Sequence, residues 1–172
     1  MLDSKNTFKI LVIDDNLEIH SDFQKILSFE VSGDENLADL DKKLFGQASQ
    51  IFSSLPHFQI DSAMQGEEGC RMVRESLAIQ QPYAVIFLDV RMPPGMDGIQ
   101  AAKEIFSIDK HVQVVICTAY TDYTWDNLIE ELGLQENLLI IKKPFDSIVI
   151  RQMVISCVKK WQRARAGNFR GF

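Results

Sequence analysis

Short apolar runs, each followed by a more polar stretch, divide this chain at regular intervals. Four of the runs show no alternation: Phe8–Asp14, Tyr83–Asp89, Val112–Thr118 and Leu138–Ile141. Continuous apolar runs of this length are typical of strands buried on both faces of a parallel sheet. A fifth run, Phe58–Ala63, is weaker and alternates, which favours a strand at the edge of the same sheet.

Apolar residues at helical spacing fill the stretches between these runs. They are Phe23, Ile26 and Leu27; Cys70, Val73 and Leu77; Ile99, Ala102, Ile105 and Phe106; Trp125, Leu128, Ile129 and Leu132; and Ile150, Met153, Val154, Cys157, Val158 and Trp161. Asp146 is a predicted N-cap for the last helix. Alternating strands and helices predict an α/β fold with a doubly wound, five-stranded parallel sheet. Right-handed crossovers would then cover both faces of the sheet with helices.

One segment interrupts this rhythm. The 28 residues from 30 to 57 stand where a connection usually needs about 2–6. They begin with polar residues and then place Leu37, Leu40, Leu44 and Phe45 at helical spacing. We interpret residues 30–57 as a helical insertion between the first helix and the second strand, peripheral to a domain that covers residues 7–160.

Residues 161–172 are interpreted as a helical extension or linker. The apolar positions from Ile150 to Trp161 keep a near-heptad spacing. We therefore expect the last helix to project from the domain with an apolar stripe that needs a partner. That partner would be a second copy of the chain, in a homodimer, or an output domain.

Charge and composition narrow the class of protein. Residues 1–146 carry 12 basic and 24 acidic side chains, a net charge of −12, whereas residues 147–172 carry six basic and no acidic ones. The acidic body argues against direct nucleic-acid binding. No apolar run approaches the ~20 residues that span a bilayer, and the first residues lack a signal-peptide pattern. Three widely spaced cysteines fit a reducing compartment, so we expect a cytoplasmic protein.

Polar residues end the predicted strands. Asp14 and Asp15 end the first, Asp89 ends the third, Thr118 ends the fourth, and Lys143 follows the fifth. In an open parallel sheet the ligand site lies beyond the carboxyl ends of the strands, at the topological switch point. With the strand order 2-1-3-4-5, the first and third strands are neighbours. The three carboxylates would then lie together, with the threonine and the lysine beside them.

Three clustered carboxylates repel one another, so the cluster must take up a proton or a cation. Oxygen ligands of this kind favour Mg²⁺, which binds through one or two carboxylates together with phosphate oxygens. A carboxylate beside such a metal can attack phosphorus and form an aspartyl phosphate. A hydroxyl and an ammonium can bind the remaining phosphoryl oxygens. Each residue alone is ordinary, since an aspartate at a strand end is usually a cap; their joint order predicts phosphoryl transfer to a carboxylate.

Four motifs in this order resemble the receiver domain of bacterial two-component response regulators, or of hybrid histidine kinases. They are ILVIDD, FLDVRMPPGMDG, VVICTA and IIKKPF, and the resemblance covers about residues 8–160 apart from the insertion. It implies a flavodoxin-like receiver fold with Asp89 as the phospho-acceptor. It also implies that Asp15 binds Mg²⁺ directly, that Asp14 binds it through water, and that the backbone carbonyl of Arg91 is the third protein ligand.

The resemblance further implies that Thr118 and Lys143 contact the phosphoryl oxygens. Lys143 rather than Lys142 matches, because it directly precedes Pro144, and receiver domains generally place this lysine through a cis bond. The chain departs from the family pattern in three places. The loop after the acceptor has one residue more than usual, the insertion is not part of the usual domain, and Ile140 stands where the family often has an aromatic ring.

The leading interpretation is a phospho-acceptor signalling domain that receives a phosphoryl group from a histidine kinase or a histidine phosphotransfer protein and switches conformation. It is a regulatory domain that assists its own chemistry rather than an enzyme. One alternative is a receiver-like interaction module that signals without phosphate, which the complete set of site residues argues against. Another is a phosphatase with an aspartyl nucleophile, but such enzymes typically have an acid where Arg91 stands.

Overall fold

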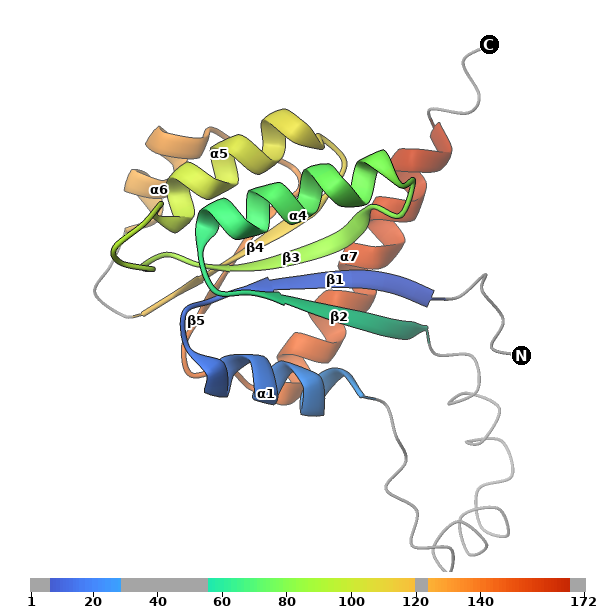
Figure 1. The fold of residues 1–172 in the computed structure, drawn as a ribbon, viewed down its shortest axis with the longest axis horizontal. Helices are drawn as coiled ribbons and strands as arrows, with labels where there is room; N and C mark the ends of the chain where they lie inside the picture. The colour runs from blue at the N-terminus through green and yellow to red at the C-terminus, as the bar shows by residue number, and fades with distance from the viewer. Residues whose placement is uncertain (1–6, 29–55, 120–123, 168–172) are drawn as a thin grey trace, which may run out of the picture.

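The computed structural model describes residues 7–28, 56–119 and 124–167. Its centre is a parallel sheet of five strands in the order β2-β1-β3-β4-β5 (Figure 1). The strands are β1 Thr7–Ile13, β2 His57–Ala63, β3 Tyr83–Asp89, β4 Gln113–Thr118 and β5 Leu138–Lys142. Each bound lies within one residue of the predicted one, and the predicted strand order is confirmed.

The burial of each strand matches its sequence pattern. Every residue of β3 and β4 is buried, as their unbroken apolar sequences predict for strands covered on both faces. The alternating sequence of β2 forms an edge strand, in which Ala63 is buried and the other residues are partly or fully exposed. The acceptor candidate Asp89 therefore ends the most enclosed part of the sheet, next to β1.

Helices cover the two faces of the sheet (Figure 1). They are α1 Leu17–Leu27, α4 Gly66–Ala78, α5 Gly98–Ile108, α6 Trp125–Leu132 and α7 Ser147–Gly167. Two separate buried clusters show the division. One joins α4, α5 and α6 to one face of the sheet, and the other joins α1 and α7 to the opposite face. The chain is thus doubly wound, as predicted.

Short polar side chains begin these helices. The side chain of Asn16 accepts a hydrogen bond from the backbone N–H of Glu18 at the start of α1. Asp97 forms a capping box with Gln100 at the start of α5. The predicted cap of the last helix is confirmed, because Oδ1 of Asp146 accepts from the N–H groups at the first turn of α7. The Asn16 cap closely follows β1, and the Asp97 cap lies between β3 and α5. These two caps therefore also fix the path of the chain as it leaves the site.

The expectation of a projecting apolar stripe on the last helix is wrong for the residues that were to form it. Val154, Cys157 and Val158 are buried in the cluster between α7 and the sheet. Trp161 packs edge-on against Phe8 of β1, with ring centroids 6.2 Å apart. The helix packs on the domain's own sheet, and this packing buries the apolar residues that were expected to bind a partner.

The predicted insertion, residues 30–57, lies outside the described part of the chain except for Pro56 and His57 at the start of β2. Among the helices that the structure describes, none combines the length and the apolar character needed to cross a bilayer. The described domain is therefore the sheet with its two helical layers. The candidate site lies at the carboxyl ends of the strands.

Candidate functional site

The carboxyl ends of β1 and β3 bring three acidic side chains together. The two strands are parallel neighbours with Ile13 opposite Leu88, so Asp14 and Asp89 leave the sheet side by side. Ligand oxygens of Asp14, Asp15 and Asp89 all lie within 4.8 Å of one another. Asp14 and Asp89 are buried, whereas Asp15 is exposed. The structure thus assembles the acidic cluster that the strand order predicts.

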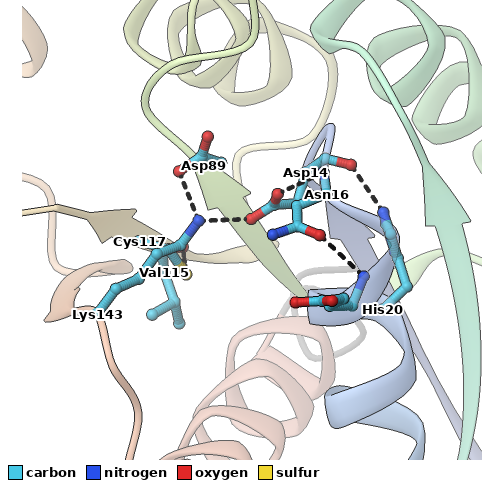
Figure 2. Close-up of polar contacts among 8 residues, drawn as sticks. Asp14, Asn16, His20, Asp89, Val115, Cys117 and Lys143 are labelled. Atoms are coloured by element: carbon cyan, nitrogen blue, oxygen red, sulfur yellow. Dashed lines mark hydrogen bonds and ion pairs between the residues drawn. The ribbon is translucent and has the colours of Figure 1, made fainter.

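Lys143 brings a positive charge into this cluster. Its Nζ lies 2.7 Å from Oδ2 of Asp14 and 2.9 Å from Oδ1 of Asp89, so one ammonium bridges the two buried carboxylates (Figure 2). The backbone N–H of Lys143 donates to the carbonyl of Thr118, which ties the loop after β5 to the end of β4. The predicted cis bond between Lys143 and Pro144 is present. Lys142, by contrast, is an exposed residue of β5.

Negative charge exceeds positive charge in this cluster. Burial raises the pKa of the Asp89 carboxyl above its ordinary value, and the negative charges of Asp14 and Asp15 add to this rise, while Lys143 opposes it. Burial also acts to lower the pKa of the Lys143 ammonium. Its hydrogen bonds to Asp14 and Asp89 outweigh that effect, so its pKa is raised and it stays charged. One ammonium does not balance three carboxylates, and the site favours a further cation.

The oxygen donors fit Mg²⁺. Two buried carboxylates and one exposed carboxylate offer hard ligands on one side of the cluster, where the exposed Asp15 leaves room for the waters that this ion retains. No histidine or thiol of the described residues belongs to this group of ligand atoms. An ion of this class would offset the negative charges of Asp14 and Asp15, which add to the rise that burial causes in the pKa of Asp89.

Asp14 is held through each of its polar groups, and Figure 2 shows its contacts with Asn16, His20 and Lys143. Its N–H donates to the carbonyl of Ala63 at 3.1 Å, and its Oδ1 accepts from the N–H of Asn16 at 2.9 Å. Its Oδ2 pairs with Lys143, and its carbonyl oxygen accepts a hydrogen bond of 2.7 Å from Nε2 of His20. A carboxylate fixed in this way has little freedom to adjust to a ligand, so its position is set before one binds.

Reasoning from the sequence did not include His20 and Asn16 in the site. A signal for His20 existed: it shares the buried stripe of α1 with Phe23 and Leu27, where a polar ring needs a partner. Its spacing from the acidic pair matches no metal or catalytic motif, so spacing alone could not assign it to the site.

Thr118 lies where the sequence places it, at the end of β4, and it is buried. Its hydroxyl donates to the carbonyl of Ala119 at 2.9 Å. Its neighbour Cys117 belongs to the apolar cluster beneath α1 and α7, as expected for a small buried residue. Thr118 therefore ends the strand next to β3, and the contact of its hydroxyl with a phosphoryl oxygen stays a prediction.

The loop after β3 passes close to the backbone of the acceptor candidate. A Cβ added to Gly98 would lie 2.1 Å from the carbonyl oxygen of Asp89, so only glycine fits here. The N–H of Gly98 donates to the carbonyl of Val90 at 2.8 Å, which closes the loop that carries Arg91. The role of the Arg91 carbonyl as a ligand stays a prediction.

The additional residue of this loop is accommodated against the start of α4. Oε1 of Glu67 accepts a hydrogen bond of 2.8 Å from the N–H of Met96. A Cβ at Gly95 would approach Glu67 and Gln65 to about 3 Å, so the loop lies flat on this helix. The longer loop therefore follows a defined path at the border of the site.

Comparison with known proteins agrees with this geometry. A family model described as the response regulator receiver domain matches residues 36–155, more than half of the chain. The chain is 39% identical over 70 residues to sporulation initiation phosphotransferase F of Bacillus subtilis; the alignment covers 41% of this chain and 53% of that protein, about half its length. It is 29% identical over 113 residues to chemotaxis protein CheY of Treponema pallidum, covering 66% and 74% of the two chains.

Solved structures share the fold. A CheY-like receiver domain protein from Methanospirillum hungatei matches with a TM-score of 0.64 at 14% identity, covering 92% of this chain and 98% of the other. The CheX–CheY–BeF3–Mg²⁺ complex from Borrelia burgdorferi matches with a TM-score of 0.58 at 23% identity, covering 87% of each chain. At these identities the structures support the flavodoxin-like fold alone.

The matched range begins after β1, so the places of Asp14 and Asp15 in the site rest on the geometry and not on the family model. The strand order, the lysine bridge and the matched range nevertheless agree with one another. The chain belongs to the response regulator receiver domain family.

Proposed function

We propose that Asp89 is the phospho-acceptor and that a histidine kinase or a histidine phosphotransfer protein is the donor. The observation that carries this proposal is the position of the Asp89 carboxylate. It ends β3, pairs with Lys143 at 2.9 Å, and lies within 4.8 Å of ligand oxygens of Asp14 and Asp15. In the transfer, an oxygen of Asp89 forms the new bond to phosphorus. The bond from phosphorus to the donor imidazole breaks, and its electron pair stays on that ring.

The residues around Asp89 have distinct roles in this proposal. Asp14, Asp15, Asp89 and the backbone carbonyl of Arg91 would hold Mg²⁺, whose charge would offset that of the phosphoryl oxygens. Lys143 favours the attacking, ionised form of Asp89, because its ammonium opposes the rise that burial causes in the pKa of that carboxyl.

After transfer, the Lys143 ammonium and the hydroxyl of Thr118 would donate to phosphoryl oxygens. Both groups already have partners: Lys143 pairs with Asp14 and Asp89, and Thr118 donates to Ala119. A phosphoryl group would exchange these contacts for new ones. That exchange is the physical basis of the conformational switch.

We further propose that the receiver domain covers residues 7–160 with the insertion at 30–57. Residues 161–172 would then act as an extension that leads toward an output domain or a second copy of the chain. Residues 161–167 continue α7 along the domain, so any such partner meets a helix that is already anchored. A bacterial cytoplasm suits the domain, with neither nucleic acid nor a membrane as its own ligand.

Incubation with acetyl phosphate and Mg²⁺, followed by intact mass measurement, tests the proposal. One phosphoryl group should be added to the wild type, and none to Asp89→Asn or to the wild type in EDTA. Asp61→Asn is the matched control, since Asp61 is another aspartate of the same sheet that is paired with a lysine. Labelling of Asp89→Asn would refute the acceptor, and an unlabelled wild type would favour the phosphate-independent interaction module.

A further inference from the structure

Within the described part of the chain, His20 makes one polar side-chain contact, and that contact is with the acidic site. The ring lies on α1, is only 7% exposed, and its Nε2 is 2.7 Å from the carbonyl oxygen of Asp14 (Figure 2). A carbonyl oxygen can only accept, so Nε2 carries the hydrogen. The other ring nitrogen, Nδ1, is buried and has no hydrogen-bond partner among the described residues.

Packing alone does not explain a histidine here. His20 belongs to the buried stripe of α1 with Phe23 and Leu27, and both of those side chains are apolar. A leucine or phenylalanine would fill the same stripe without burying an unpaired nitrogen, and an unpaired buried polar atom destabilises the folded state. The bond to Asp14 is the interaction that an apolar side chain could not supply.

That bond fixes a peptide plane. The carbonyl of Asp14 and the N–H of Asp15 belong to one planar unit, so a donor that holds the carbonyl also sets the direction in which Asp15 leaves the strand. The N–H of Asp14 is already held by Ala63, and its carboxylate by Asn16 and Lys143. His20 holds the remaining polar group. Together these contacts fix Asp14 relative to Asp15.

We propose that His20 is a positioning residue for the cation site, which orients the Asp14–Asp15 peptide so that both carboxylates face the ion. The inference rests on the proposed function, because it takes the acidic cluster as the site of Mg²⁺. Groups that orient metal ligands typically contribute about 10–100-fold to metal affinity or activity. His20 acts through a backbone carbonyl rather than on a ligand atom, so we expect the lower end of that range.

The test measures Mg²⁺ binding to the unphosphorylated chain by calorimetry, with the melting temperature measured in parallel. His20→Phe should weaken binding about tenfold, and His20→Gln should recover most of the loss, because its amide nitrogen can donate in place of Nε2. Phe23→Leu, in the same buried stripe, should lower the melting temperature and leave the affinity within about twofold, the change expected when no ligand-orienting contact is lost.

Wild-type affinity in folded His20→Phe would overturn the inference, as would equal losses in His20→Gln and His20→Phe. If His20→Phe does not fold, His20→Asn replaces it: its shorter amide does not reach the carbonyl, so it should bind more weakly than His20→Gln. The same titration separates the two proposals. A wild type that binds no Mg²⁺ refutes the cation site itself, whereas tight binding that is insensitive to His20 refutes the positioning role alone.

Discussion

Away from the carboxyl edge of the sheet, Asp109 and Asp61 each have a basic partner of their own, whereas Asp14 and Asp89 at that edge share the ammonium of Lys143. The first arrangement balances charge pair by pair. The second leaves an excess of negative charge next to Asp15, and this charge adds to the rise that burial causes in the pKa of Asp89. The comparison separates carboxylates that stabilise the fold from carboxylates whose mutual repulsion a bound cation would relieve.

The carboxylate that pairs with Arg165 is more enclosed than that of Asp61. Oδ2 of Asp109 lies 2.7 Å from Nη2 of Arg165, and only 4% of the Asp109 side chain is exposed, against 25% for Asp61. The other oxygen of Asp109 accepts a hydrogen bond from the N–H of His111. The guanidinium of Arg165 also stacks 5.1 Å above the ring of Trp161. These contacts anchor the end of α7 to the end of α5.

Breaking this pair should give the largest effect on stability. Arg165→Met keeps much of the side-chain volume but leaves the buried Asp109 carboxylate without its cation, so we expect a loss of about 3 kcal/mol in the free energy of unfolding. Urea denaturation of the wild type and of Arg165→Met measures this loss. Labelling by acetyl phosphate should be unchanged in the folded variant. A loss below about 1 kcal/mol, the range of exposed pairs, would show that solvent already screens the pair.

Removing a charge at the site should not destabilise the protein in the way that Arg165→Met does. Asp14→Asn removes one of three repelling charges and keeps the oxygen that accepts from Asn16, so stability should be unchanged or higher. Mg²⁺-dependent labelling should fall about tenfold or more, because a cation ligand is lost. Labelling rates and melting temperatures measured on the same samples test both parts. A strongly destabilised Asp14→Asn would place this residue with the stabilising pairs.

Asp61 offers the smallest effect and a pH dependence. Burial acts to raise the pKa of Asp61, but hydrogen bonds from Tyr83 and Lys9 outweigh it and lower the pKa. A lowered pKa in the folded state means that the carboxylate contributes stability at neutral pH, and that the contribution is lost as the pH falls through the folded-state value.

Asp61→Asn should therefore cost about 1 kcal/mol at pH 7, since a quarter of the side chain is exposed to solvent screening. The difference from wild type should shrink as the pH falls below the ordinary carboxyl range, at about pH 4. Urea denaturation at neutral pH and again below that range measures both quantities. A difference that grows on acidification would contradict the sign of the shift.

The fold and most of the site could be predicted because both follow from local sequence. Unbroken apolar runs specify buried strands, and parallel strands bring the residues at their carboxyl ends, such as Asp14 and Asp89, to one edge. His20 was missed because its role is a contact with a backbone carbonyl, which no side-chain spacing reports. The stripe that ends at Trp161 was assigned to a partner because an apolar helix face does not specify which surface covers it.

Trapping the phosphorylated residue chemically tests the central claim most directly. Borohydride reduces an acyl phosphate to the alcohol, so the labelled aspartate becomes homoserine and can be located by tandem mass spectrometry of the digested protein. Wild-type chain labelled with acetyl phosphate and Mg²⁺ should carry homoserine in place of Asp89, with Asp14, Asp15 and Asp61 intact. Homoserine at one of these three positions, with Asp89 unchanged, would contradict the account.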